Sequence, residues 1–409
     1  MNYDPHSRYD TPLPIATQEM VWNPTWPVEK LWRKCTMQAA PDNKGQKPTF
    51  NLSPTEFSAP TAYEQWIASV GIPIHRGYFV EDARTVELGW WEERQCNAAF
   101  AVLAGQEGVS EVRITEIPPG ATLPPVKFGL DESVYVLDGG GLTTLSTDDG
   151  QRVSFEWQPH SMFLLPRHTR AQLSNTRGDR PARLVHYNYL PSVMNAVPDL
   201  GYLFDNPYSD PSALEHGYSE AKVSRGGATG GMGFWTGNFF ADMRAWDRLD
   251  PYKGRGAGGH VVWVQYPTSS IWAHMSVFPA RSYKKAHRHG PGTLIVIPSG
   301  EGFSFMWPEG QERVFIPWHE GSIFVPPDRW FHQHFNLTAE PARYLAMHAP
   351  RGANQSERVE NIIRDQIEYP DEELLIRQTF EGELAKRGLQ SAMPDAAYRD
   401  RGYEWNYEA

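Results

Sequence analysis

Cysteine and long apolar runs are scarce in this sequence of 409 residues. Only Cys35 and Cys96 are present, in no CxxC pair, which excludes a disulfide framework and a cysteine metal site and favours a reducing, cytoplasmic setting. No run of 18 apolar residues occurs, and the polar start MNYDPHSRYD lacks the apolar stretch of a signal peptide. We therefore expect no membrane span and no secretion signal.

Positive charge is also scarce. The formal net charge is −11, and no run of five or more residues is rich in Lys and Arg. Because proteins bind nucleic acids largely through a basic surface that contacts phosphates, we expect no nucleic-acid partner.

Proline, glycine and aromatic residues are abundant instead. The chain has 34 Pro, 35 Gly and 15 Trp, a composition that favours short strands and turns over long helices. Short apolar or alternating runs between Gly, Asp and Pro turns predict an all-β dominated fold with two sandwich or barrel regions. The expected segments are an N-terminal elaboration (1–96), a first barrel (97–191), a Gly-rich connector (192–259), a second barrel (260–350) and a helical C-terminal tail (351–409).

Helical patterns are few. Start and stop signals predict helices at 61–71, 240–249 and 371–388, the last with Asp371 as its N-cap.

An internal repeat links the two β regions. A single shift of 161 positions superimposes five residue pairs without a gap. Two copies of one β unit are therefore expected. The pairs are Gly139 with Gly300, Trp157 with Trp318, Phe163 with Phe324, Pro166 with Pro327 and Asn175 with Asn336.

Histidines distinguish the second copy from the first. Under this shift His287, His289 and His332 fall on Val126, Phe128 and Ala171, and Thr293 falls on Glu132. Strand side chains alternate, so His287 and His289 should point to one face, about 7 Å apart. His332 from a neighbouring strand would complete a three-nitrogen set for a divalent metal. The alternative is that these are core or surface histidines with ordinary hydrogen bonds.

These spacings resemble the two sequence motifs of the cupin superfamily. The second motif reads Gly321, Pro327, His332 and Asn336, with Arg329 in place of the inner Gly; the first reads His287, His289, Thr293 and Gly300. Arg281 replaces the leading Gly of the first motif, and Thr293 replaces the Glu that binds metal in the family. The resemblance implies a bicupin of two double-stranded β-helix (jelly-roll) barrels, with a metal site in the second barrel and no metal ligands in the first.

Two sequence segments narrow the resemblance to one group of cupin enzymes. AHRHGPGTLIVIPSGEG and GSIFVPPDRWFHQHFN resemble the matching segments of the gentisate and salicylate ring-cleaving dioxygenases. The resemblance implies Fe(II) held by His287, His289 and His332, a hydroxy-acid that chelates the iron, dioxygen as co-substrate, and His334 near the substrate. Those enzymes place the metal in the N-terminal barrel, whereas here the histidines are in the C-terminal one.

An anionic substrate would also need a cation, and three arginines stand beside the motifs. Arg281 has the parity of His287 and His289 and is the expected substrate-binding arginine, whereas Arg288 should point outward. Ordinary surface charge is the alternative interpretation for both and for Arg329.

Other side chains could complete the site. His334 is the first candidate for proton transfer, followed by Tyr344 and His348 on the last predicted strand. A fourth metal ligand and a residue at the rim of the site are the alternatives for His334. Trp307, Trp318 and Trp330 could line an aromatic pocket, but with 15 Trp in the chain most must be core.

The leading hypothesis is a cytoplasmic Fe(II)-dependent dioxygenase that acts on a small hydroxylated aromatic or related hydroxy-acid. A lyase, isomerase or hydrolase that uses Zn, Mn, Ni or Co on the same ligands remains open. A non-catalytic bicupin that binds a small ligand is a further alternative. By family resemblance we also expect a homo-oligomer.

Overall fold

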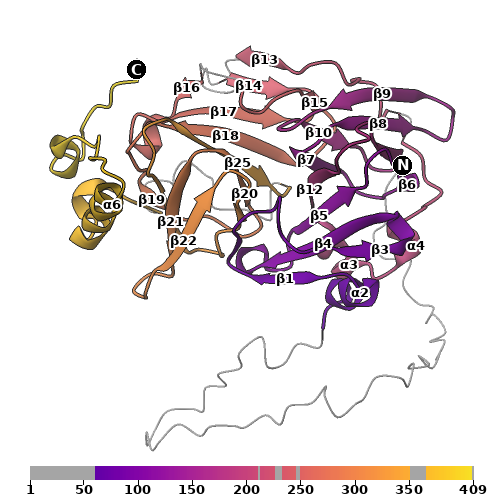
Figure 1. The fold of residues 1–409 in the computed structure, drawn as a ribbon, viewed down its shortest axis with the longest axis horizontal. Helices are drawn as coiled ribbons and strands as arrows, with labels where there is room; N and C mark the ends of the chain where they lie inside the picture. Colours follow the sequence, from indigo (N-terminus) through magenta and orange to yellow (C-terminus); the bar gives the residue numbers. More distant parts are fainter. Residues whose placement is uncertain (1–59, 211, 226–232, 246–248, 351–364, 408–409) are drawn as a thin grey trace, which may run out of the picture. The chain divides into compact units, whose positions relative to one another are not determined.

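The computed structural model describes residues 60–210, 212–225, 233–245, 249–350 and 365–407, in which β-strands dominate (Figure 1). Cys35 and most of the predicted N-terminal elaboration lie outside these residues, and Cys96 is a buried free thiol. Among the described residues no helix is long and apolar enough to cross a lipid bilayer.

The first barrel is built from two facing sheets. Four strands form the centre of one sheet, in the order β5-β12-β7-β10, and the other sheet has the order β6-β11-β8-β9. Their inward faces bury a core that includes Leu145, Phe163 and Leu184. The strands are β5 (Glu111–Ile117), β6 (Val126–Lys127), β7 (Glu132–Asp138), β8 (Gly141–Ser146), β9 (Arg152–Trp157), β10 (Met162–Leu165), β11 (Arg170–Asn175) and β12 (Ala182–Asn188).

The second barrel repeats this topology strand for strand. Its sheets have the orders β18-β25-β20-β23 and β19-β24-β21-β22, which are those of the first barrel in the same chain sequence. The prediction of two cupin barrels is therefore confirmed. The strands are β18 (Trp272–Phe278), β19 (Ala286–His287), β20 (Leu294–Ser299), β21 (Glu301–Trp307), β22 (Val314–His319), β23 (Ile323–Phe324), β24 (Phe331–Asn336) and β25 (Ala342–His348).

The repeat extends to backbone conformation. Arg281 and Arg329, which stand where the cupin motifs have Gly, both have positive φ, at 52° and 59°. The left-handed region costs a non-glycine residue about 1–2 kcal/mol, so the fold imposes these turns whichever residue occupies them. Five pairs at the 161-residue shift share a positive φ: Gln95 with Gly256, Gly120 with Arg281, Gly139 with Gly300, His160 with Gly321, and His168 with Arg329.

Each barrel is preceded by a unit that also repeats, a feature that the sequence prediction missed. Strand β1 (Ile74–Gly77) pairs in parallel with β4 (Cys96–Leu103), and β14 (Gly233–Thr236) pairs in parallel with β17 (His260–Gln265). The short strands β3 (Gly89–Trp91) and β16 (Asp250–Pro251) pair antiparallel with β4 and β17. The N-terminal and connector segments are thus equivalent parts of the two copies.

These preceding units are exchanged between the barrels. Strand β2 (Phe79–Val80), before the first barrel, pairs with β23 of the second, and β15 (Phe239–Phe240), before the second barrel, pairs with β10 of the first. Backbone contacts repeat the exchange: the Ala83 amide donates to the Gly321 carbonyl, and the Met243 amide donates to the His160 carbonyl, both at 2.9 Å. The exchange fastens the two barrels to each other.

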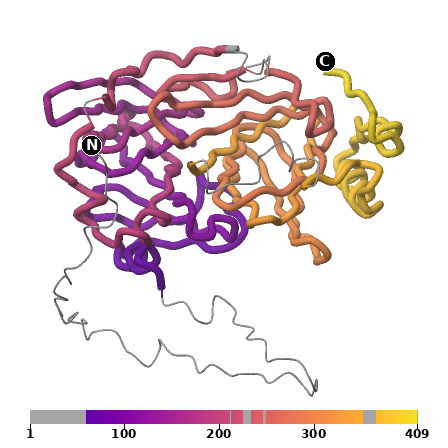
Figure 2. Tube along the Cα trace, turned by 180° about the vertical axis from the view of Figure 1, so that it is seen from behind, coloured from indigo at the N-terminus to yellow at the C-terminus, as the bar shows by residue number. Residues whose placement is uncertain are grey.

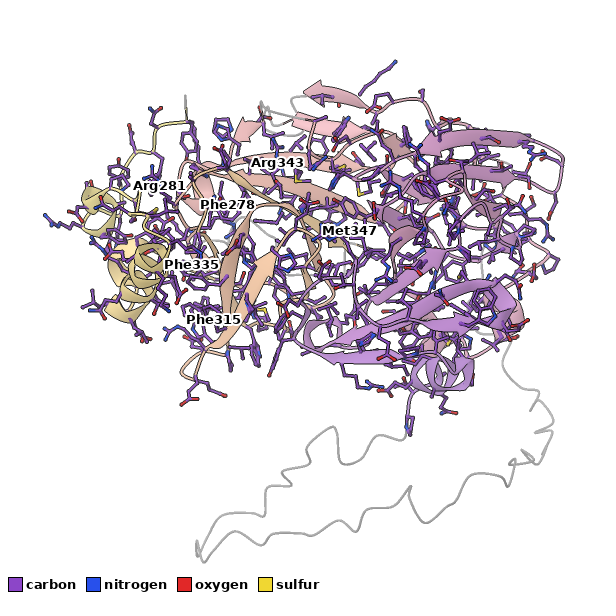
Figure 3. The ribbon with its side chains drawn as sticks, in the orientation of Figure 1. Phe278, Arg281, Phe315, Phe335, Arg343 and Met347 are labelled. Atoms are coloured by element: carbon purple, nitrogen blue, oxygen red, sulfur yellow. The ribbon has the colours of Figure 1, made fainter. Side chains whose placement is uncertain are left out.

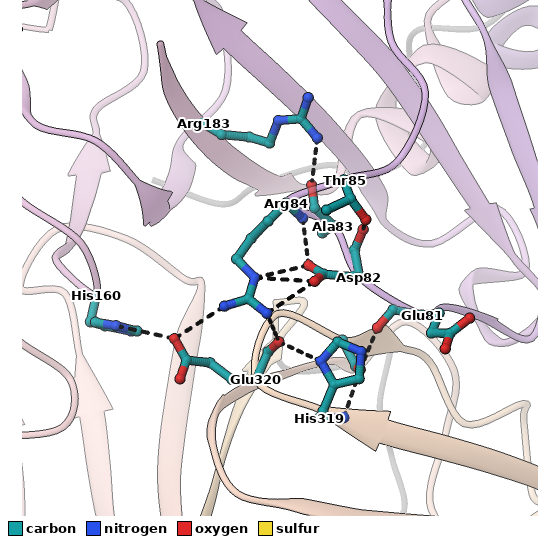
Figure 4. Close-up of polar contacts among 10 residues, drawn as sticks. Glu81, Asp82, Ala83, Arg84, Thr85, His160, Arg183, His319 and Glu320 are labelled. Carbon is teal, nitrogen blue, oxygen red and sulfur yellow. Dashed lines mark hydrogen bonds and ion pairs between the residues drawn. The ribbon is translucent and has the colours of Figure 1, made fainter. Parts of the chain in front are cut away.

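Figure 4 shows the contacts of one exchanged unit, that of residues 81–85, with the two barrels. The Arg84 guanidinium bridges Asp82, at 2.9 Å, and the Glu320 carbonyl of the second barrel, at 2.7 Å. Arg183 of β12 donates to the Ala83 carbonyl at 3.3 Å. A hydrophobic cluster with Leu164 of the first barrel and Leu345 of the second lies at the same junction.

Helices are short and peripheral. Helix α2 (Ala62–Val70) forms where predicted, and α3 (Leu190–Ala196) and α4 (Leu200–Leu203) lie in the connector. The helix predicted at 240–249 is wrong in its described part, because Phe240 pairs with Met162 in a sheet. Single 3₁₀ turns occupy η2 (Glu92–Arg94), η3 (Ala104–Gln106), η5 (Lys253–Arg255), η7 (Tyr369–Asp371) and η8 (Asp395–Tyr398), and β13 (Lys222–Arg225) pairs with β14.

The C-terminal segment covers the outer face of the second barrel (Figure 2). Helix α6 (Leu374–Lys386) buries Ile376, Phe380 and Leu384 against Phe335 of β24, the apolar face that its spacing predicts. Its N-cap is Glu373 and not the predicted Asp371. Strand β26 (Gln366–Ile367) pairs antiparallel with β19 at the edge of the sheet. The C-terminal segment therefore supports the strand that carries His287.

Candidate metal centre

Three histidines converge in the second barrel. His287 of β19 and His332 of β24 lie opposite each other in an antiparallel pair, and His289 follows two residues after His287. One ring nitrogen from each of the three lies within 4.8 Å of the others. All three are buried, with His332 only 1% exposed. The structure thus brings together the three residues that the sequence singled out.

Hydrogen bonds leave these rings in a form suited to a metal. The Nδ1 atoms of His287, His289 and His332 face the carbonyl oxygens of Lys285, Gly290 and Trp330, at 3.4, 2.8 and 3.3 Å. A carbonyl only accepts, so Nδ1 carries the hydrogen in each ring and Nε2 keeps its lone pair. Three Nε2 lone pairs in one place fit a divalent metal of the type that imidazole binds.

Burial keeps the cluster neutral. It lowers the pKa of His287 and His332 well below the usual value and that of His289 to about 4, and the charges of Arg255 and neighbouring histidines add to the effect for His287. Neutral imidazole is the form that binds metals. Thr293, in place of the family's Glu, adds no negative charge.

His334 lies next to this cluster but is not part of it. Its ring centroid is 5.6 Å from that of His332 and 5.0 Å from that of Tyr344. Its Nδ1 and the Ser304 hydroxyl are 2.7 Å apart, and the Trp318 indole donates to the same hydroxyl at 3.0 Å. Burial lowers the pKa of His334 to about 3.

A pair of histidines, His274 and His348, lies further along the same lumen. Nδ1 of His274 is 2.9 Å from Nε2 of His348, and the other nitrogen of His348 is 3.3 Å from the Thr293 hydroxyl. His348 was a predicted candidate, whereas His274 was not. Its inward parity with Ser276 and Phe278 on β18 was the available signal.

Lys284 is another buried polar side chain of the second barrel that the sequence did not predict. It is fully buried, its Nζ donates to the Ser276 hydroxyl and, at 3.3 Å, to the Tyr344 hydroxyl. The Tyr344 ring lies 4.7 Å from Nζ. Burial lowers the pKa of Lys284 well below its usual value. Among the residues that the structure describes it has no carboxylate partner.

The predicted arginines lie elsewhere. Arg281 is placed beside the C-terminal segment (Figure 3), where its guanidinium reaches the Gln390 carbonyl at 3.5 Å and the Ala392 amide donates to its carbonyl. The expectation that it faces the site is therefore not met, because the left-handed turn at Arg281 breaks the strand alternation on which the argument relied.

Arg288 points outward as its parity predicts. It pairs with Asp365 at 3.1 Å and with Glu309 at 2.7 Å, and Arg329 also pairs with Asp365, at 2.7 Å. Arg255, from the connector turn η5, carries a charge that acts on His287, His289 and His332, and the charge of Arg329 also acts on His289.

The three tryptophans have different surroundings. Trp318 is a core residue, 2% exposed. Trp307 and Trp330 line a surface groove together with Tyr78 and Arg313. An aromatic-lined groove thus exists on the second barrel, without Trp318.

No family model matches the chain. A gentisate 1,2-dioxygenase from a Streptomyces species is 27% identical over 82 residues, which are 20% of this chain and 22% of that protein. The match therefore spans about a fifth of the length of this curated relative.

Solved structures with a similar fold include oxalate decarboxylases. A mutant of the Bacillus subtilis enzyme has a TM-score of 0.44 and 11% identity, covering 68% of this chain and 78% of that one. The Lactobacillus farciminis enzyme in a formate complex has a TM-score of 0.43 and 12% identity, covering 66% and 85%. The chain thus has two barrels of one topology, with a three-histidine cluster in the second, and it resembles a gentisate 1,2-dioxygenase over 82 residues.

Proposed function

We propose that this protein is an Fe(II)-dependent dioxygenase that acts on a small hydroxylated aromatic or related hydroxy-acid, with the metal held by His287, His289 and His332. The observation that carries the proposal is a buried set of three neutral imidazoles with no carboxylate among them. Such a set leaves the full double charge of the metal and several coordination positions for an anionic, chelating substrate and a second reactant. Bound Fe(II) would supply the site where that substrate and dioxygen meet and the electrons that activate oxygen.

The surrounding residues support a hydroxy-acid substrate. Tyr344 and His334 lie side by side, 5.0 Å between ring centroids, where they can hold or accept the proton of a substrate hydroxyl. His334 is neutral at physiological pH, so a ring nitrogen can accept a hydrogen bond from a substrate hydroxyl, although its low pKa makes it a weak base. Both side chains are buried, with His334 2% and Tyr344 4% exposed, so their polar contacts are little screened by solvent.

Lys284 replaces Arg281 as the proposed binding group for the substrate's carboxylate. Its Nζ is held by two hydroxyls, of Ser276 and Tyr344, and by no acid among the described residues. An incoming carboxylate would favour its ammonium form and gain a charge-assisted hydrogen bond.

Oxygen uptake tests the proposed reaction. Protein purified without oxygen or chelators is loaded separately with Fe(II), Mn(II) and Zn(II) and offered hydroxybenzoates, related phenols and hydroxy-acids. We expect turnover only with Fe(II), with one dioxygen consumed for each product formed. Turnover under nitrogen would instead indicate a lyase or hydrolase, and saturable binding without product would indicate a ligand-binding bicupin. A cytoplasmic location and a homo-oligomeric state stay predictions.

Replacing Lys284 tests the carboxylate contact. Lys284→Met is expected to raise KM for the acid substrate by about tenfold or more while kcat changes less, because a contact made equally in ground and transition states is lost. The exposed Lys253→Met is the matched control. A variant that is folded, by circular dichroism, and has an unchanged KM would remove Lys284 from the proposed site.

A further inference from the structure

The first barrel contains a cavity in the position where the second barrel has its metal site. Val126, Phe128 and Ala171, the equivalents of His287, His289 and His332, all line it. The cavity volume is ≈ 80 Å³, several times the roughly 10–15 Å³ that one water molecule needs. Its wall carries no metal donor at the three equivalent positions, so its occupant, if any, is not a metal held in the manner of the second barrel.

Most of the cavity wall is apolar. Leu123, Leu130, Leu165 and Leu173 add to the three residues above. Cys96 also lines the cavity, and burial raises the pKa of its thiol to about 11. The thiol is therefore protonated and behaves as a small apolar group and not as a nucleophile.

The polar groups at one side of the cavity satisfy one another. Arg113 pairs with Glu111 at 2.5 Å and with Glu132 at 2.7 Å. His186 bridges Glu132 and the Thr115 hydroxyl, at 2.7 and 2.8 Å. The guanidinium of Arg113 therefore already has its carboxylates, and this cluster offers no unpaired cation to an anionic ligand.

Arg94 differs from Arg113 in having no such partner. Its guanidinium carbon lies 5.3 Å from the centroid of Trp91 and 5.5 Å from that of Phe204. Within the described parts of the chain it makes no hydrogen bond and no ion pair, although it lines the cavity and is only partly exposed. Burial, and then the charge of Arg113, lower the pKa of Arg94, yet a guanidinium stays charged at any physiological pH.

We propose that the first barrel is a second ligand site, which binds a small monocarboxylate with an apolar body. The carboxylate would form a bidentate pair with Arg94, between Trp91 and Phe204, and the apolar body would lie among Leu123, Leu173 and their neighbours. One cation without a carboxylate partner, in a mostly apolar wall whose other charged groups pair with one another, favours a single negative charge over a phosphate or dicarboxylate. The site lies in the other barrel from the metal centre and does not depend on the reaction proposed there.

Calorimetric titration of the full chain with benzoate tests the site. The titrations use the His287→Ala, His289→Ala background, so that a metal-bound carboxylate in the second barrel does not contribute. Benzoate is expected to bind saturably, and Arg94→Gln is expected to weaken it by about tenfold or more, the size of a lost charge-assisted contact. Benzamide, which has the same shape without the charge, should bind weakly and be indifferent to Arg94→Gln. The exposed Arg152→Gln is the matched control.

A second variant tests the site independently, in case Arg94→Gln does not fold. Ala171→Phe fills the cavity from the position of His332 and should abolish binding of both probes while circular dichroism stays unchanged. Hexanoate serves as a second monocarboxylate probe, and the proposal is overturned if neither benzoate nor hexanoate binds saturably to the folded protein with Arg94 intact. It is also overturned if Arg94→Gln leaves benzoate affinity unchanged, or if Ala171→Phe does.

Discussion

The double variant His287→Ala, His289→Ala should be purified with less than about a tenth of the metal that the parent carries, and with activity lower by about a thousandfold or more. The three imidazoles form the only cluster of metal-ligating side chains within the described residues, and the double substitution leaves one donor, His332. Since a single neutral imidazole holds a divalent ion weakly, both occupancy and the reaction that depends on it are lost. Inductively coupled plasma mass spectrometry on protein never exposed to chelators gives the occupancy.

His216→Ala is the matched control for this experiment. His216 is exposed, so its loss removes an imidazole without touching the lumen, and metal content should equal that of the parent. Near-stoichiometric metal in the double variant would place the site elsewhere, and folded parent protein without metal would refute the proposed centre. Stoichiometric zinc or manganese in place of iron would shift the proposed reaction toward a lyase or hydrolase.

The sequence predicted the barrels and the three histidines because both depend on regular spacing. An ungapped shift of 161 residues survives only if every strand and turn between the paired positions is kept. His287 and His332 then fall on paired strands because the register of the barrel is fixed by that repeat. Where strands and turns repeat regularly, the periodicity of the sequence is therefore enough to predict which side chains point into the lumen.

The same signal was present upstream and was overlooked. RGYFVEDAR at 76–84 and TGNFFADMR at 236–244 share Gly, Phe, Asp and Arg at a shift of 160, and the structure shows both segments exchanged onto the opposite barrel. The helical reading of 240–249 failed for this reason, since apolar spacing alone does not separate a short strand with a turn from a short helix.

Lys284 and Arg255 could not be predicted, because no periodicity reaches them. Strand β19 has only two residues, so the alternation counted back from His287 no longer holds at Lys284 or at Arg281. Arg255 comes from a turn in the connector. A tertiary contact holds this turn in place: the Lys285 amide donates a hydrogen bond to the Arg255 carbonyl at 3.0 Å. Side chains delivered by turns depend on such contacts and not on local pattern.

The polar side chains of the two lumens have opposite roles. In the second barrel, His274, Thr293 and His348 lie at the end of a lumen that holds a candidate metal centre. At the equivalent positions the first barrel has Arg113 and Glu132, which pair with each other at 2.7 Å. An internal ion pair thus takes the place of the ligand system in the barrel without histidine ligands, and the stability of that barrel should depend on it.

Arg113→Met is accordingly expected to destabilise the protein by about 3–5 kcal/mol, the range found when one partner of a buried pair is removed. Burial alone would raise the pKa of Glu132, but the charge of Arg113 and the contact with His186 outweigh it and hold that pKa well below the usual range. Without Arg113, Glu132 would be left ionised and buried with only neutral partners. Equilibrium denaturation in urea, followed by tryptophan fluorescence, measures the loss, and the exposed Arg152→Met is its control.

The pH dependence of this loss separates charge from packing. A carboxyl with a lowered pKa in the folded state contributes stability above its unfolded pKa of about 4.3, and that stability disappears as the pH falls below it. In Arg113→Met the pKa of Glu132 is instead raised, so the variant regains stability as the pH falls and the group is protonated. The difference between variant and parent should therefore be larger at about pH 7.5 than at about pH 4.5. An equal difference at both values would mean that Arg113 acts through its packing on Trp91, 5.8 Å away, and not through its charge.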